Sequence, residues 1–113
     1  MREPDLVRLR HMLDAVREIG TLTAGMSREE FRRDRVVSLA VTRLLEVLGE
    51  AANCVSDEVK GIHRGIPWSQ MISMRNRLIH GYYDVDLDII WSTVSEDIPP
   101  LVGVLEDVIR TEG

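Results

Sequence analysis

The sequence contains one cysteine, one lysine and no long uninterrupted run of apolar residues. A single cysteine, Cys54, cannot build a disulfide framework or a cysteine-based metal cluster, which is typical of proteins in a reducing cytosol. No stretch approaches the ~18 apolar residues that a transmembrane helix needs. The first residues are charged and no apolar core of a signal peptide follows them. We therefore expect a cytoplasmic protein that does not interact with membranes.

Aromatic residues are also scarce, at 4% of the 113 residues, but 44% of the chain is hydrophobic. The core must therefore be built largely from aliphatic side chains. A chain of this length falls in the ~100–150-residue mode of domain sizes and can bury one core without a disulfide or a structural metal. We predict a single domain, residues 1–113, and assign it no cofactor and no metal.

The net charge of −5 is unevenly distributed. Residues 1–80 carry 13 basic and 11 acidic side chains, whereas residues 81–113 carry one basic side chain, Arg110, and eight acidic ones. An acidic protein is a poor candidate for binding nucleic acid through its overall field, because that binding exchanges phosphate counterions for protein cations. Any contact with nucleic acid must therefore be local and would involve residues 1–80.

Apolar residues recur at spacings of three and four almost throughout the chain, which predicts an all-α fold. The first helix would bury a stripe that includes Leu9, Met12 and Val16. Ser27 and Glu30 have the spacing of a capping box, which predicts that another helix starts there. The main helices are expected at residues 5–24, 34–56, 68–80 and 87–111.

Three breaks are predicted between or within these helices. Residues 57–66 contain two glycines and little periodicity, so we interpret them as a loop. Gly81 is expected to end the third helix in the left-handed conformation. Pro99 and Pro100 should kink or split the last helix, because neither can donate a backbone hydrogen bond. The predicted architecture is an up-and-down bundle of four main helices plus short helices.

The segment 74–82 holds the densest collection of side chains that could perform chemistry, and these are Arg75, Asn76, His80 and Tyr82. Arg75 and His80 are five positions apart, which separates them by about 140° on a straight helix. Three arrangements would bring them together. The helix could loosen near Gly81, the arginine could reach round, or Arg75 of one chain could meet His80 of a second. Alternatively, Arg75 and Arg77 are surface charges, and His80 only interacts with the helix dipole.

The pattern Arg75-x4-His80-x-Tyr82 resembles the motif of HepT-type toxins, which are minimal members of the HEPN superfamily of ribonucleases. Further pieces stand in the order that this family shows, over nearly the whole chain. They are Gly49-Glu50-Ala51-Ala52, Ile66-Pro67-Trp68, Met74-Arg75-Asn76, Val85-Asp86 with Trp91, and Asp97-Ile98-Pro99. Ser73 departs from the glycine that many relatives have before the Met-Arg-Asn.

The resemblance implies a toxin that cleaves RNA, not DNA, without a metal, at a site formed in the interface of a homodimer. Arg75 and His80 would be catalytic, since histidine is the side chain suited to exchange a proton at neutral pH and arginine offers a planar set of donors for phosphate. Asn76 could orient His80 or hold a phosphate oxygen. The rival interpretation is a non-catalytic helical module that binds a nucleotide or docks a nucleotidyltransferase.

The same resemblance implies a partner, a nucleotidyltransferase antitoxin that transfers AMP to Tyr82 and so silences the toxin. The acidic last helix would then be a surface for this antitoxin or a limit on indiscriminate RNA binding. We interpret Tyr83 as structural and His63 as a solvated loop histidine. Asp84, Asp86 and Asp88 lack the glycine and distal glutamate of an EF-hand, and are expected to cap the last helix instead.

Overall fold

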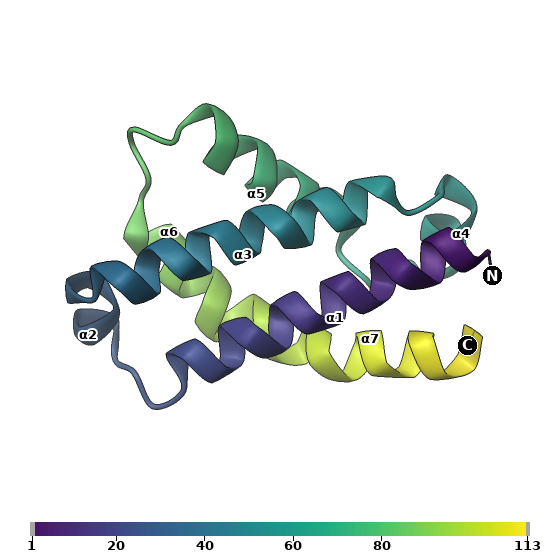
Figure 1. Ribbon diagram of the computed structural model, residues 1–113, viewed down its shortest axis with the longest axis horizontal. Helices are drawn as coiled ribbons and strands as arrows, with labels where there is room; N and C mark the ends of the chain where they lie inside the picture. Colours follow the sequence, from purple (N-terminus) through teal and green to yellow (C-terminus); the bar gives the residue numbers. More distant parts are fainter. Residues whose placement is uncertain (1, 113) are drawn as a thin grey trace.

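The computed structural model describes residues 2–112, so Met1 and Gly113 of the predicted domain lie outside the described residues. Within this range the chain forms helices and no strands, which confirms the all-α prediction (Figure 1). The elements in order are α1 (Glu3–Thr23), α2 (Arg28–Arg33), α3 (Arg35–Cys54), α4 (Asp57–Ile62), α5 (Trp68–His80), α6 (Leu87–Ser92), the π-helical turn η1 (Thr93–Asp97) and α7 (Ile98–Glu112). No helix within residues 2–112 combines the length and the apolar character that a membrane crossing requires.

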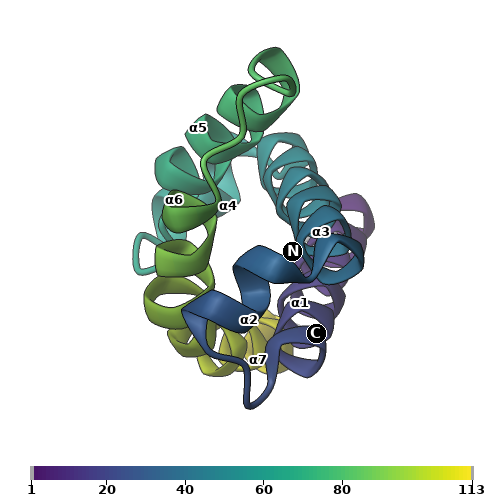
Figure 2. The same cartoon turned by 90° about the vertical axis from the view of Figure 1, so that its left-hand side faces the viewer.

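The long helices lie side by side with alternating directions, as expected for an up-and-down bundle. α3 packs against both α1 and α5, and α7 packs along the other side of α1 (Figures 1 and 2). The fourth predicted helix is the series α6, η1 and α7. Its first part, α6, lines a small hollow together with α5. α3 is therefore the central element, and it supplies the surface against which α5 is placed.

The core is aliphatic, as the scarcity of aromatic residues predicts. Leu9, Met12 and Val16 of α1 are fully buried, and Phe31 is the one phenylalanine inside. Further buried side chains come from each of the long helices, among them Ile19, Val41, Leu45, Leu48, Leu101 and Leu105. Val36, which belongs to the apolar run of α3, is instead 78% exposed.

Ser27 and Glu30 form the capping box that their spacing predicts. The Glu30 amide donates to Ser27 Oγ at 3.1 Å, and the Ser27 amide donates to Glu30 Oε1 at 3.0 Å. The hydrogen bond from the Ser27 amide favours the carboxylate and, together with the Ser27 side chain, lowers the pKa of Glu30 below its ordinary value. Asp34 follows α2, and its side chain caps α3 by accepting from the Val37 amide at 3.0 Å.

The predicted loop at residues 57–66 is wrong over its first half, where the chain forms α4. Ser56 caps this helix by accepting from the Val59 amide. Acidic residues occupy its first turn, where their negative charge interacts favourably with the helix dipole. Ser56 in turn donates its amide and its hydroxyl to the buried carboxylate of Asp5, both at 2.8 Å. A helix of six residues is too short to show periodicity, but its cap was visible in the sequence.

The last predicted helix is divided, as expected, but the irregular turn precedes the two prolines. Pro99 and Pro100 lie in the first turn of α7. Because they have no amide hydrogen, the carbonyls of Ser95 and Glu96 receive no α-helical bond from them. The turn before them widens into η1, in which the Ile98 amide donates to the Thr93 carbonyl, five residues back.

Candidate active site

The candidate site is built at the carboxyl end of α5. The helix continues to His80, and the Gly81 amide closes it by donating to the Arg77 carbonyl at 2.8 Å. The predicted left-handed conformation is wrong, because Gly81 has a φ of −109° and only Gly25 has a positive φ within residues 2–112. Glycine is needed at position 81 for space instead, since a Cβ atom would come within 2.9 Å of the Arg77 carbonyl oxygen.

Arg75 is held by one ion pair and one hydrogen bond. Its Nη2 lies 2.6 Å from Glu50 Oε2 on α3, and its Nη1 donates to Asn76 Oδ1 at 2.8 Å. The Arg75 side chain is 27% exposed, and its Nε is buried without a hydrogen-bond partner. The guanidinium group therefore has a defined position, and its outer edge remains accessible.

Gly49 explains how α5 comes so close to α3. A Cβ atom at this position would overlap the Cβ atom of Arg75 and lie 2.6 Å from the Met71 carbonyl oxygen. The two helices are therefore in backbone contact at the turn that carries Arg75. Sequence reasoning included Gly49 and Glu50 only as part of a resemblance and gave neither a role. A glycine inside a strongly periodic helix was the available signal of close packing.

His80 is exposed at the end of α5, and no hydrogen bond or ion pair in residues 2–112 involves its side chain. α5 does not loosen before His80, so the angular separation of His80 from Arg75 persists. Arg75 reaches Glu50 and Asn76 rather than His80. Two of the three arrangements considered above, a loosened helix and an arginine that reaches round to the histidine, are therefore absent from the described chain.

Tyr82 and Tyr83 occupy the two central positions of a turn, which the Asp84 amide closes by donating to the Gly81 carbonyl at 2.9 Å. Tyr82 is 77% exposed and Tyr83 is 81% exposed. The two rings meet edge to face with centroids 5.6 Å apart. The interpretation of Tyr83 as a structural residue is therefore wrong, because its ring projects into solvent as far as that of Tyr82. Sequence spacing cannot reveal this, since both residues follow the helix directly.

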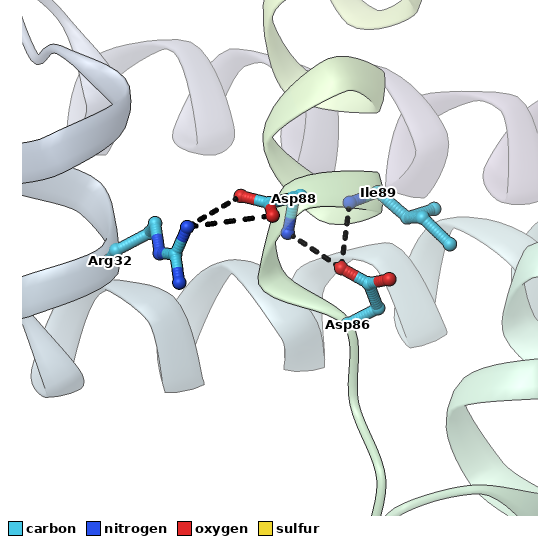
Figure 3. Close-up of polar contacts among 4 residues, drawn as sticks. All are labelled: Arg32, Asp86, Asp88 and Ile89. Atoms are coloured by element: carbon cyan, nitrogen blue, oxygen red, sulfur yellow. Dashed lines mark hydrogen bonds and ion pairs between the residues drawn. The ribbon is translucent and has the colours of Figure 1, made fainter.

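The chain after the turn is fixed to the bundle through the start of α6 (Figure 3). Asp86 accepts from the amides of Asp88 and Ile89, at 2.9 and 3.3 Å, and so caps α6 as predicted. Arg32 of α2 donates to the carboxylate of Asp88 at 3.2 Å (Figure 3). The segment that carries the tyrosines is thus anchored at both ends, by α5 on one side and by this capped and bridged helix on the other.

The prediction that His63 is a solvated loop histidine is wrong. Its side chain is only 17% exposed, and its Nε2 lies 2.9 Å from Glu112 Oε1 at the end of α7. The His63 carbonyl accepts from the indole nitrogen of Trp68 at 3.0 Å. These contacts connect the segment before α5 to α7, at the end of the bundle opposite His80. His63 therefore has a structural environment and is not part of the candidate site.

The candidate site is on an open surface. A largely apolar hollow of about 350 Å³ lies between α3, α5, η1 and α7, and Arg77 and Asp97 are among its lining residues. Its lining includes none of the four site residues predicted from the sequence, Arg75, Asn76, His80 and Tyr82. A substrate bound at these residues would contact the outside of a single chain.

The family model and the relatives that match this chain are all described as ribonucleases. A family model described as "Ribonuclease HepT-like" matches residues 12–108. The chain is 40% identical over 98 residues to a "Probable ribonuclease HepT" of Thermococcus cleftensis, covering 87% of this chain and 89% of the relative. It is 34% identical over 104 residues to the "Putative RNase TTE0752" of Caldanaerobacter subterraneus, covering 92% and 93%. No solved structure gives a significant match.

Proposed function

Because the chain belongs to the ribonuclease HepT-like family, we propose that it is an endoribonuclease and the toxin of a toxin–antitoxin pair. The observation that carries this proposal is the geometry at the end of α5. An arginine held by an ion pair and a hydrogen bond, and a histidine without a protein partner, lie five positions apart on an open surface. RNA is long and polyanionic, and such a surface can receive it where a closed cavity could not.

The proposed reaction is attack by the 2′-hydroxyl of the RNA on the adjacent phosphorus. The 2′-oxygen forms a bond to phosphorus, the bond from phosphorus to the 5′-oxygen breaks, and the products are a 2′,3′-cyclic phosphate and a 5′-hydroxyl. His80 moves the proton, from the attacking hydroxyl or to the leaving oxygen. Arg75 stabilises the charge that develops on the phosphoryl oxygens. Asn76 accepts a hydrogen bond from Arg75 Nη1, so it acts through Arg75 rather than through His80.

A second copy of the chain is proposed to complete the site. Glu50 is 11 positions after Leu39 and 14 positions after Val36, which is close to three and four whole helical turns. The three residues therefore share one face of α3. Leu39 is 55% exposed and Val36 is 78% exposed. Burying such side chains against a second copy would be favourable, at about 25 cal/mol per Å² of apolar surface. A partner on this face would lie beside Arg75 and could contribute its own His80.

Tyr82 is the proposed site of AMP transfer by a nucleotidyltransferase antitoxin. Its phenol is accessible, and no hydrogen bond in residues 2–112 engages it. A phosphodiester-linked AMP two residues from His80 would place negative charge and bulk where the RNA phosphate must bind. The attached group would therefore prevent cleavage without changing the fold.

Intact-mass measurement after incubation with a nucleotidyltransferase antitoxin and ATP tests this modification. We expect additions of AMP on the wild-type chain and none on the Tyr82→Phe variant. Tyr83→Phe is the matched control, because the two rings have nearly equal exposure, 77% and 81%, in the same turn. Additions that persist in Tyr82→Phe and vanish in Tyr83→Phe would move the site to the second tyrosine.

Incubation of purified protein with RNA in the presence of EDTA tests the ribonuclease proposal. We expect cleavage to persist in the chelator, with products that end in a 2′,3′-cyclic phosphate, because the proposed groups are an imidazole and a guanidinium. Cleavage that is lost in EDTA and restored by a divalent cation would contradict the mechanism. A protein that binds RNA or nucleotide and never cleaves it would instead support the non-catalytic docking module.

A further inference from the structure

We infer that Glu50 of α3 is a positioning residue for Arg75, which it holds ready for the phosphate of the substrate. This inference rests on the proposed ribonuclease function. It concerns a residue to which neither the family motif nor the comparisons assign a role. The three nitrogen atoms of the Arg75 guanidinium group differ in what they contact.

The guanidinium of Arg75 is bound in such a way that part of its donor capacity remains available. Arginine carries five N–H donors, one on Nε and two on each Nη. Nη1 uses one on Asn76 at 2.8 Å, and Nη2 forms an ion pair with Glu50 Oε2 at 2.6 Å. Each Nη therefore keeps at least one donor, and donors from the two Nη atoms can together bind two oxygens of one phosphate. Glu50 and Asn76 thus fix the group while leaving a phosphate-binding edge.

The buried part of the side chain supports the same role. Nε is buried without a partner, and the Cβ atom of Arg75 lies directly over Gly49, one residue before Glu50. The stem of Arg75 is therefore confined by the helix contact, and the ion pair to Glu50 fixes its far end. An arginine with both ends fixed loses little further rotamer freedom when it binds a phosphate.

The ion pair itself contributes little to the stability of the fold. The Glu50 side chain is 53% exposed, and exposed pairs of this kind have small effects on unfolding. Removing the carboxylate should therefore affect the orientation of Arg75 much more than the fold. It also removes a negative charge beside the place where the RNA phosphate binds, so RNA binding should not weaken.

The test is the kinetic effect of Glu50→Ala on RNA cleavage. We expect kcat to fall about tenfold, the cost of ordering one long side chain, while KM for RNA stays the same or decreases. Glu50→Gln keeps an oxygen that can accept from Nη2, so it should restore part of kcat. A damaged fold would raise KM or lower the melting temperature and would not be rescued in this way.

Glu46→Ala is the matched control, because Glu46 lies one turn earlier on α3 and pairs with Arg43 rather than with Arg75. Its kcat should equal that of the wild type. A second measurement is independent of activity, namely NMR relaxation of the Arg75 Nε–H group. Its order parameter should fall in Glu50→Ala and remain unchanged in Glu46→Ala.

Two results would overturn the inference. One is an unchanged or increased kcat in Glu50→Ala together with an unchanged Arg75 order parameter. The other is an equal loss of kcat in Glu46→Ala. If the wild-type protein does not cleave RNA, the proposed function fails, and the NMR comparison still decides whether Glu50 fixes Arg75.

Discussion

Replacing His80 with alanine is expected to abolish RNA cleavage, with a loss of about 10²- to 10⁴-fold, the usual contribution of a positioned acid or base. His80 is exposed, and no hydrogen bond in residues 2–112 involves it, so its removal should leave the fold unchanged within about 0.5 kcal/mol. Initial rates on a defined RNA, measured beside a thermal melt, check both expectations. The control is His11→Ala, because His11 is an exposed histidine on α1 outside the site. Cleavage that survives in His80→Ala would contradict the assignment.

Arg75→Ala is expected to reduce cleavage by about 10²- to 10³-fold, the typical cost of removing one donor that stabilises developing charge. Arg75→Lys separates charge from geometry, because lysine keeps the charge but lacks the planar pair of donors. We expect the lysine variant to remain far below the wild type. Near-normal activity in Arg75→Lys would show that a point charge is sufficient.

Mixing the His80→Ala and Arg75→Ala variants tests whether the site is shared between two chains. If Arg75 of one chain acts with His80 of its partner, a mixed dimer has one intact site, and an equal mixture should regain about a quarter of wild-type activity. If each chain uses its own pair, mixing restores nothing although the mass remains that of a dimer. A monomeric mass in analytical ultracentrifugation would contradict the dimer itself.

Gly49→Ala is expected to destabilise the protein by about 1–3 kcal/mol, the usual cost of inserting a methyl group into a packed contact. The expected sign is unusual, because glycine to alanine inside a helix normally stabilises by about 1 kcal/mol. Here the new Cβ atom would overlap the Cβ atom of Arg75 and approach the Met71 carbonyl oxygen to 2.6 Å. Neither of these atoms can move without the backbone of α5, so the overlap is removed only if α5 moves away from α3. Denaturant unfolding measures the effect, and activity should fall as Arg75 shifts.

Gly103→Ala is the matched control for this substitution. Gly103 also lies inside a helix, α7, and a Cβ atom there would meet nothing within 4 Å. This variant should gain about 0.5–1 kcal/mol from helix propensity alone. Equal stabilisation by both variants would show that α3 and α5 are not in close contact at Gly49.

The sequence was sufficient for the elements that have strong periodicity or a clear cap. The helix at Trp68–His80 and the capping box at Ser27 were predicted correctly. α4 was missed because six residues, Asp57–Ile62, are fewer than two turns and cannot show a repeat. The widened turn Thr93–Asp97 lies one turn before Pro99 because a proline disturbs the carbonyls four residues behind it.

The candidate site could be located from sequence, but its contacts could not. Arg75, Asn76, His80 and Tyr82 were visible as a cluster in one short segment. The ion pair from Glu50 to Arg75 joins residues on two helices, and only their packing at Gly49 determines it. Exposure was equally hidden, since nothing in the order of residues separates a solvated Tyr83 from a packed one.

The anchored turn has a consequence for the strength with which an inhibitory group must bind. Tyr82 is two residues from His80, so their Cα atoms cannot be more than about 7 Å apart. The segment that carries Tyr82 is fixed by α5 before it and by the Asp86 cap after it. If Tyr82 carries a nucleotide as proposed, that group is therefore present beside His80 at an effective concentration of at least millimolar order. It needs almost no intrinsic affinity to occupy the site, whereas a free nucleotide would have to bind tightly to do the same.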